Sequence, residues 1–500
     1  MNKLMRPKER LSSSLLWFTA LGSLAVSPAI AQVQSMTVPP SAVANQPKRA
    51  VSVTKTPVAK TAVPVTKTPT KPEVSVVRTP KVGPDTLAPS NPDFKADQPE
   101  TAQQATTPAP LPPAVWDVQR AQELLGYINQ IGGDGLNPED YDPEGLQTAI
   151  QSGNVEALSA AATERFDLVS SDLALGHVKK PARIDWYLAD KDLDAAKQDA
   201  LLRSALARHD LTTELNGLLP THPQYAALKA ALAATPASDE AQRDRIRLNM
   251  DRWRWLPRDL GEKYIIVNVP GFHATLVENG VNRWKQKAIA GKLSTPTPEL
   301  SAMATGVILN PWWEVPKSIE HEAAGKKGFV PVKGPDGEIQ RWRQPPGPTN
   351  ALGQIKFVMP NSQAIYLHDT NARSRFNSDA RALSHGCVRT EHIMDLATQL
   401  LGDDGGDWTP DRIQAALESK RTVQASFVKP VPVYIVYFSD AALLDGRIIE
   451  YKDLYGRDPK ALAALKMKDG GASMAKPKDE IIATPKSKKA AKPANQVAAR

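Results

Sequence analysis

The 500-residue chain contains a single cysteine, Cys387, so no disulfide can form within it. A lone cysteine in a folded protein is usually a small buried apolar side chain. In an oxidising compartment, however, a thiol that stays free is an indication that it is used. The residues around the thiol have to decide between these two interpretations.

Long apolar runs are also scarce. One lies at the N-terminus, where a basic segment (3–10) precedes an apolar stretch (15–26) and the small residues Ala29-Ile30-Ala31. This order predicts a signal peptide over residues 1–31, cleaved after Ala31. The alternative is that the apolar stretch remains uncleaved as a membrane anchor. No other stretch has the length and apolarity of a transmembrane helix, so we expect a soluble mature chain outside the cytoplasm.

Aromatic residues make up only 6% of the chain and do not interleave with its basic segments, which argues against nucleic acid as a partner. Residues 32–114 are rich in Pro, Thr, Val and Lys, and residues 461–500 return to Lys, Ala and Pro. Neither segment can bury enough apolar area to offset its ordering entropy, so both are expected to be disordered. They carry much of the net charge of +8, and they could contact an anionic envelope surface or simply be solvated.

What the sequence does contain begins with a helical pattern over residues 115–245. Apolar residues recur three or four positions apart, as at Phe166, Val169 and Leu173, and a glycine-rich stretch at 132–135 predicts a loop. Residues 245–259 are rich in Arg and Trp. We interpret them as a joint to the next domain, with Trp side chains packed on that domain and Arg heads in solvent.

From residue 264 the pattern changes to a period of two, which predicts strands. Asn279-Gly280 is a strong signal for a hairpin turn between strands 272–278 and 281–290, and short helices are expected at 390–401 and 410–417. The expected fold class is α+β, with a mostly β domain over residues 246–460 after the helical domain. Further expected strands are 264–269, 306–309, 355–359, 364–368, 424–428, 433–438 and 447–451, the last two joined across Asp445-Gly446 and closing the sheet.

Residues 313–342 interrupt the strands with four glycines between two tryptophans. Long loops in compact domains are often functional. We expect a short, mobile cap over the site, with a plain surface loop as the alternative.

The stretch 365–389 carries the reactive groups. Cys387 lies in the sequence SHGCVR (384–389), and His368 precedes it by 19 positions at the end of an apolar run. A thiolate is the reactive form of cysteine, so the thiol needs a base within reach. Acyl transfer also needs backbone N–H groups directed at the oxyanion, and Gly386 permits a tight turn there. His368, Gly386 and Cys387 are therefore candidate catalytic residues.

These motifs resemble the YkuD-type L,D-transpeptidase catalytic domain, whose signature is a His, a spacer and Ser/Thr-His-Gly-Cys. Further similar pieces are TPTP (295–298), NPW (310–312), QPPGPTNALG (344–353) and DLYGRD (453–458). The last piece and residues 136–141 resemble the long Gram-negative branch, which has a helical N-terminal scaffold. The small peptidoglycan-binding helical module usual in that branch has no evident counterpart here, since the chain passes almost directly from Ala234 to residues 243–255.

The resemblance implies a β sandwich or barrel in which Cys387 is the acylated nucleophile and His368 the proton donor and acceptor, with no metal or organic cofactor. The partners it implies are peptidoglycan stem peptides in the periplasm: a tetrapeptide donor would lose D-Ala and join another stem in a 3–3 cross-link. Water or a lipoprotein lysine as acceptor would instead make the enzyme an L,D-carboxypeptidase or a lipoprotein-attaching enzyme, and a free D-amino acid is a further possible acceptor. Carbapenems would acylate the same thiol.

Other residues near the thiol have open roles. Arg389 could favour the thiolate, steer a substrate carboxylate or buttress the turn, and His385 is expected to orient the loop rather than act as a second base. Asp369 could orient His368, through its backbone carbonyl better than its side chain, because neighbours in a strand point to opposite faces. Residues expected to contact substrate are Tyr366, Ser384 and Asn350.

Two rival classes remain. A zinc hydrolase could use His368, His385, Cys387 and His392 as ligands, but no metalloprotease motif is present. Inhibition by chelators without sensitivity to thiol alkylation would favour it. A wall-binding scaffold without activity is the other class, and failure of a carbapenem to acylate Cys387 would favour that.

Overall fold

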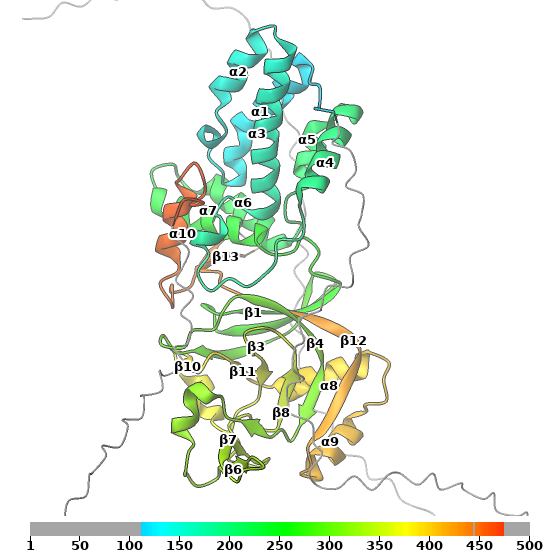
Figure 1. The fold of residues 1–500 in the computed structure, drawn as a ribbon, viewed down its shortest axis with the longest axis vertical. Coiled ribbons are helices and arrows are strands. Elements are labelled where there is room, and N and C mark those ends of the chain that lie inside the picture. The colour runs from blue at the N-terminus through cyan, green and yellow to red at the C-terminus, as the bar shows by residue number, and fades with distance from the viewer. Residues whose placement is uncertain (1–111, 444–445, 475–500) are drawn as a thin grey trace, which may run out of the picture. The chain divides into compact units, whose positions relative to one another are not determined.

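The computed structural model describes residues 112–443 and 446–474, all of which belong to one compact unit (Figure 1). The predicted signal peptide, nearly all of the predicted linker and the part of the predicted tail from residue 475 lie outside the described residues. The prediction of disorder from residue 461 is wrong for the start of that tail, because helix α10 (Asp458–Leu465) buries Ala461 and Ala464 against the helical region. No described helix is long and apolar enough to cross a membrane. The region up to residue 254 is helical, as predicted. Its helices are α1 (Val118–Gln130), α2 (Pro143–Gln151), α3 (Val155–Leu175), α4 (Ala195–Arg208), α5 (Leu211–Asn216), α6 (Pro223–Ala234) and α7 (Glu240–Arg254).

Short polar side chains begin these helices. Asp117, Asn154 and Asp194 each accept a hydrogen bond from a backbone N–H three residues further on, which satisfies a donor that has no partner inside the helix. The apolar faces meet around Phe166 and Leu173 of α3, both fully buried. The helical spacing of the apolar residues therefore reflects a packed core.

Helix α7 joins this region to the strands that follow. The Trp253 ring stacks on Phe438 at 4.6 Å and is buried, so the prediction that Trp side chains pack on the next domain is confirmed. The prediction that the Arg heads reach solvent is wrong, since Arg252 is 3% exposed. Its guanidinium donates to Asp458 (2.6 Å) and Ser439 (3.0 Å). A cation can be buried here because a carboxylate meets it.

The main sheet closes on itself. Its strand order is β10-β3-β11-β9-β8-β4-β12-β1-β2, and β2 also pairs with β3. This is the predicted mostly β, barrel-like domain. Asn279 and Gly280 have φ of 50° and 74°, as the predicted hairpin turn requires. The strands are β1 (Lys263–Asn268), β2 (His273–Glu278), β3 (Val281–Gly291), β4 (Leu300–Leu309), β8 (Ile355–Val358), β9 (Leu367–His368), β10 (Ala382–Ser384), β11 (Val388–Thr390) and β12 (Val423–Val436).

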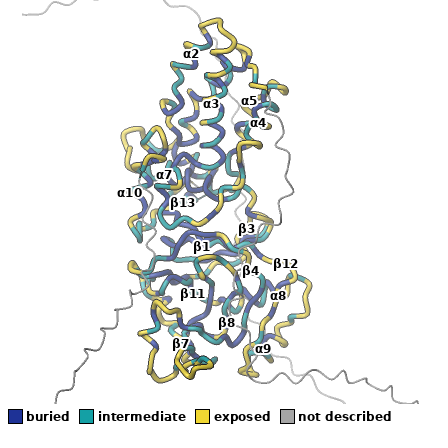
Figure 2. The backbone as a smooth tube through the Cα atoms, in the orientation of Figure 1, coloured by how far each residue is buried: buried dark blue, intermediate teal, exposed yellow. Residues whose placement is uncertain are grey.

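Apolar side chains fill the ring of strands. They include Val307, Phe357 and Val388 on three different strands, and Leu396 of helix α8 (Ile393–Asp403) joins the same core. Helix α9 (Pro410–Glu418) follows, so both predicted short helices are confirmed. The barrel strands are mostly buried in Figure 2, whereas the segment around β7 is largely exposed. A rigid packed core therefore lies behind the strands that carry the reactive groups.

Three strand predictions need correction. The strands expected at 424–428 and 433–438 are one strand, β12, because a register shift between Ser426 and Val431 bends it without ending it. The strand expected over 364–368 shrinks to β9, since Ala364 has a φ of 52°. The prediction that 447–451 closes the main sheet is wrong, because β14 (Ile448–Glu450) pairs with β13 (Asp440–Ala442). The chain leaves the barrel at Ser439, whose N–H bonds Asn249 of α7.

Residues 313–344 form a small folded cap and not an irregular flap. A 3₁₀ helix, η4 (Lys317–Glu322), and the strands β5 (Trp313–Glu314), β6 (Val330–Lys333) and β7 (Ile339–Gln344) build it, with the strands in the order β5-β7-β6. Val315 and Ile319 form its small core, against which Trp313 and Trp342 pack. The cap therefore has more regular structure than the sequence predicted.

Candidate active site

The pairing of β9 with β11 brings the candidate residues together. The two strands are parallel, with Val388 opposite Leu367 and Arg389 opposite His368. Val388 and Leu367 point into the barrel core. Because side chains alternate along a strand, Arg389 and His368 lie on the other face. Cys387 directly precedes β11, and the charges of Lys356 and Arg389 act on its thiol. The outer face of this strand pair is the candidate site.

Lys356 reaches the same face from β8, where it pairs with His368. Lys356, His368 and Arg389 thus form a row across three adjacent strands, which lie about 4.8 Å apart. The Lys356 Nζ lies 4.6 Å from the centre of the Tyr366 ring, a cation–π contact. Sequence reasoning missed Lys356, which lies between two apolar residues of an expected strand, because the sequence does not show which strand pairs with that one.

His368 is held as a neutral base. Its Nδ1 lies 2.5 Å from the Asp369 carbonyl oxygen, so Nδ1 carries the proton and Nε2 keeps a free lone pair. The prediction that Asp369 orients His368 through its backbone is confirmed. Burial, and next the charge of Arg389, lower the pKa of His368 to about 3. The ring is therefore uncharged at neutral pH.

Cys387 is half-buried, and its Sγ lies 3.8 Å from the Ala364 carbonyl oxygen. Burial raises the pKa of the thiol, while hydrogen bonds from Tyr366 and the charges of Lys356 and Arg389 act to lower it. Burial also raises the pKa of Tyr366 well above its ordinary range. At rest the site therefore holds a thiol and not a thiolate, and four groups around it favour the thiolate once it forms.

The loop before Cys387 is fixed by hydroxyl groups. The Ser384 hydroxyl donates to the Cys387 carbonyl oxygen (2.6 Å) and accepts from the Gly386 N–H (3.1 Å). Thr297 Oγ1 donates to the Gly386 carbonyl oxygen (2.7 Å) and accepts from the Gly291 N–H (2.8 Å). Gly386 itself has a φ of 115°, which favours glycine. Since the Gly386 N–H is engaged, the Cys387 N–H is the better candidate for an oxyanion donor.

Thr297 is held in turn by a buried arginine that the sequence did not reveal. Arg457 donates to the Thr297 carbonyl oxygen (3.0 Å), to Glu299 (3.2 Å) and to Asp185 (2.7 Å). Asp185 lies between α3 and α4 in the helical region. A chain of hydrogen bonds therefore runs from the helices to the peptide bond next to Cys387. Arg457 belongs to the recognised DLYGRD motif, which was the one available signal.

The cap touches the site at two points. The His385 Nε2 lies 3.1 Å from Glu322 of η4, so this ring faces the cap, consistent with an orienting role. Trp313 of β5 forms a hydrogen bond with Tyr366 that acts to lower the raised pKa of the phenol. The cap thus contacts the loop before the thiol and the tyrosine beside it.

Two parts of this chain match known protein families. Residues 262–434 match YkuD, the L,D-transpeptidase catalytic domain, and residues 113–232 match the Scaffold domain. A Haemophilus influenzae protein named "Putative L,D-transpeptidase" is 32% identical over 250 residues, covering 45% of this chain and 50% of that protein. This chain therefore spans about half the length of that curated relative. Residues 262–434 are an L,D-transpeptidase catalytic domain.

Solved L,D-transpeptidases resemble this chain only distantly. L,D-transpeptidase 1 of Mycobacterium tuberculosis is 15% identical, with a TM-score of 0.17, and the match covers 35% of this chain and 61% of that one. An L,D-transpeptidase of Mycobacterium smegmatis is also 15% identical, with a TM-score of 0.18, over 35% of this chain and 58% of its own.

Two further residues of the catalytic domain that the sequence singled out are engaged elsewhere. Asn350 is fully buried, and its side-chain amide donates to the carbonyl oxygens of Pro311 (2.9 Å) and Pro345 (2.9 Å), so it holds its own loop. His392 lies 3.6 Å from Asp395 in a pair on the surface. Within the described ranges, no group of three or more His, Cys, Asp or Glu side chains is arranged to hold a metal ion.

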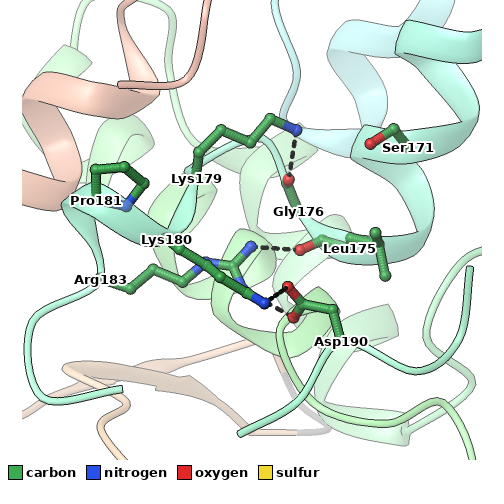
Figure 3. Close-up of a pocket in the computed structure, with 8 residues that line it drawn as sticks. All are labelled: Ser171, Leu175, Gly176, Lys179, Lys180, Pro181, Arg183 and Asp190. Atoms are coloured by element: carbon green, nitrogen blue, oxygen red, sulfur yellow. Dashed lines mark hydrogen bonds and ion pairs between the residues drawn. The ribbon is translucent and has the colours of Figure 1, made fainter. Parts of the chain in front are cut away.

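A hollow of about 320 Å³ lies in the scaffold domain (Figure 3). Lys180 and Arg183 both reach Asp190, at 3.3 and 3.2 Å. Lys179 pairs with Asp172 at 2.6 Å. Each cation that lines the hollow thus has a carboxylate partner, which leaves no free charge there for a ligand. The lining residues are Ser171, Leu175, Gly176, Lys179, Lys180, Pro181, Arg183 and Asp190.

Proposed function

We propose that this chain is a peptidoglycan L,D-transpeptidase that acts through a thioester on Cys387. The observation that carries the proposal is the pairing of β9 with β11 within an L,D-transpeptidase domain, which puts the neutral His368 opposite Arg389, two residues after Cys387. The donor is a tetrapeptide stem, cleaved between the L-centre of diaminopimelate and the terminal D-Ala. The acceptor is the diaminopimelate amine of a second stem, which gives a 3–3 cross-link.

His368 acts as the base in this proposal. Its Nε2 takes the proton of the Cys387 thiol as substrate binds, since Nδ1 is committed to the Asp369 carbonyl. Lys356 and Arg389 stabilise the thiolate electrostatically as it forms. The Cys387 thiol and the His368 imidazole are thus both neutral until substrate binds. Because the thiolate is the reactive form of cysteine, this limits side reactions of the thiol between turnovers.

Acylation and transfer then follow with one proton moving back and forth. The thiolate attacks the amide carbonyl carbon, and the Cys387 N–H stabilises the oxyanion. The carbon–nitrogen bond breaks, the D-Ala amine leaves with the proton from His368, and a thioester remains on Cys387. The acceptor amine gives a proton to His368 and attacks the thioester, and the thiolate that leaves recovers that proton.

The cap supplies the cover that transfer to an amine requires. Water competes with the amine for the thioester, so the site has to exclude it until the second stem enters. The contacts of the cap with His385 and Tyr366 support this role. Deleting residues 320–339 should therefore shift products from cross-linked dimer toward trimmed tripeptide.

The same proposal places the enzyme in the periplasm, where stem peptides are available. Cleavage after Ala31 and a tether over residues 32–114 fit this location, with the basic tail free to contact an anionic envelope surface. N-terminal sequencing of the exported protein tests the cleavage site, and a start other than Gln32 would contradict it.

The decisive experiment is incubation of the purified enzyme with tetrapeptide muropeptides, followed by mass analysis. We expect dimers that have lost one D-Ala per cross-link, and none with the Cys387→Ala variant. Tripeptide without dimers would make the enzyme an L,D-carboxypeptidase. Unchanged tetrapeptide with a folded enzyme would contradict acyl transfer altogether. Product formation that chelators block and thiol alkylation leaves untouched would favour the zinc hydrolase.

A further inference from the structure

The two cations beside Cys387, Lys356 and Arg389, have no counter-ion among the described residues. Within residues 112–443 and 446–474, neither the Lys356 ammonium nor any guanidinium nitrogen of Arg389 has a hydrogen bond or an ion pair, and the Arg389 Nε is buried. The contact recorded for Lys356 is the cation–π contact with Tyr366. Both side chains are partly buried, so water and salt screen them only in part.

Nearby charges do not neutralise this row. Glu314 of the cap attracts Lys356 at a distance, but its carboxylate is already bound to Arg341 at 3.0 Å. On the other side, the positive charge of Arg375 acts on Arg389. The outer face next to the nucleophile therefore carries an excess of positive charge.

The thiolate of Cys387 cannot serve as the standing partner of these cations. Burial raises the pKa of the thiol, so the thiolate exists mainly during turnover. A cation kept partly buried without an anion costs free energy. An anion that arrives with the substrate would remove this cost at the moment of binding.

We infer that Lys356 and Arg389 form a carboxylate-binding subsite next to Cys387, which takes a carboxylate of the acyl-donor stem peptide. The identity of the donor rests on the proposed function. Two carboxylates of a tetrapeptide stem lie near the scissile amide: that of the terminal D-Ala and that on the side-chain centre of diaminopimelate. A guanidinium next to an ammonium suits either one, since the first binds carboxylate through two parallel N–H groups and the second as a point charge.

Paired alkylating agents test the subsite without any stem peptide. Cys387 is the only cysteine, so its modification by iodoacetate, a carboxylate, and by neutral iodoacetamide can be followed by mass. Both agents need the thiolate, so the ratio of the two rates does not depend on the thiol pKa. We expect Lys356→Met and Arg389→Gln each to lower the iodoacetate-to-iodoacetamide ratio about fivefold, as expected for loss of one nearby charge.

Matched variants separate charge from folding. Lys356→Arg and Arg389→Lys keep the charge and should keep the ratio close to the wild-type value. The exposed residues Lys429 and Arg421 provide controls, and Lys429→Met and Arg421→Gln should leave the ratio unchanged. If Lys356→Met and Arg389→Gln slow both reagents equally, the cations serve only the thiolate and the subsite is overturned.

Amidated stem peptides then identify the carboxylate. We compare tetrapeptides carrying a carboxamide at the terminal D-Ala or on the side-chain centre of diaminopimelate. Amidation of the bound carboxylate should raise KM in the wild type and add little further loss in Arg389→Gln. If neither amide raises KM, the donor places no carboxylate there and the inference fails. If the wild type releases no D-Ala from any stem, the proposed function fails, while the alkylation ratio still decides whether the subsite exists.

Discussion

Two regions near the nucleophile each contain an arginine, but with opposite surroundings. One is the junction behind Thr297, formed by Arg457, Asp185 and Glu299, and the other is the outer face beside Cys387. At the junction, Arg457 is buried and meets two carboxylates, those of Asp185 (2.7 Å) and Glu299 (3.2 Å). On the outer face, Arg389 is partly buried and meets none among the described residues. Arg389 lies two residues after the nucleophile and Arg457 donates to Thr297, which holds the loop before it, so proximity to the site alone does not distinguish them.

The two guanidinium groups differ in whether a carboxylate of the protein already pairs with them. Removing one member of a buried ion pair leaves the other charge uncompensated, which costs about 3–5 kcal/mol. Removing an unpaired cation leaves no such orphan and relieves its repulsion with a neighbouring cation, here Arg375. We therefore expect the junction to contribute stability and the outer face to contribute chemistry, and mutations in the two regions should separate these readouts.

The largest expected effect lies on the outer face. Cys387→Ala and Cys387→Ser should each lower D-Ala release by at least about 10³-fold, because a neutral imidazole can ionise a thiol far more easily than a hydroxyl. Thermal melting should change little, since the contacts of the thiol with the Ala364 carbonyl and with Tyr366 are weak hydrogen bonds of sulfur. Turnover near the wild-type rate by either variant would remove the thioester mechanism.

The second effect belongs to the junction. Arg457→Met should lower the free energy of unfolding by about 3–5 kcal/mol, because it leaves Glu299 and Asp185 without their shared cation. Urea denaturation of this variant, with Arg421→Met as an exposed control and Arg389→Gln as the outer-face counterpart, measures the contrast. We expect the last two to change stability by less than about 0.5 kcal/mol. Equal losses for Arg457→Met and Arg389→Gln would erase the distinction between the two regions.

Sequence reasoning located one of these regions much better than the other. Cys387, His368 and Gly386 belong to a short motif whose chemistry can be read directly, and the backbone partner of His368 followed from the alternation of a strand. Lys356 could not be placed, because it reaches the site only through the pairing of β8 with β9. Such pairings between separate strands depend on register, which the sequence leaves open.

The joint between the helical and the β region was predicted wrongly for a related reason. The Arg-rich segment at 245–259 was expected to send its charges to solvent, yet Arg252 is buried against Asp458, which lies 206 positions away. A carboxylate that distant in sequence cannot be assigned to a particular arginine in advance. Likewise, the sequence 295–298 was recognised as a motif, but only the fold shows that the Thr297 hydroxyl holds the Gly386 carbonyl.

Thr297 connects the two regions and gives the third prediction. Thr297→Val removes the hydroxyl that bridges the Gly386 carbonyl and the Gly291 N–H while keeping the volume, so the loop before Cys387 should loosen. We expect acylation of Cys387 by a carbapenem to slow about tenfold, with Thr297→Ser restoring most of the rate. Single-turnover acylation followed by mass measures this. If Thr297→Ser is as slow as Thr297→Val, the lost methyl packing and not the hydroxyl would explain the effect.

The smallest effect concerns the pH dependence of the outer face. The charge of Arg389 lowers the pKa of His368, after burial as the larger cause. Arg389→Gln should therefore raise that pKa, and the acidic limb of kcat/KM, which lies near pH 3 for a base with a pKa of about 3, should move to higher pH. Arg421→Gln should leave the limb where it is.

The comparison of kcat/KM with kcat extends this test, because kcat/KM reports the pKa values of the free enzyme and kcat those of the substrate complex. A substrate carboxylate bound to Arg389 would neutralise the charge of Arg389 in the complex. The shift should then appear in kcat/KM and be smaller in kcat, provided circular dichroism shows that the fold persists over the pH range used. A limb that stays fixed in kcat/KM, or moves to lower pH, would show that Arg389 does not act on His368 and that the unpaired charge of the outer face has another role.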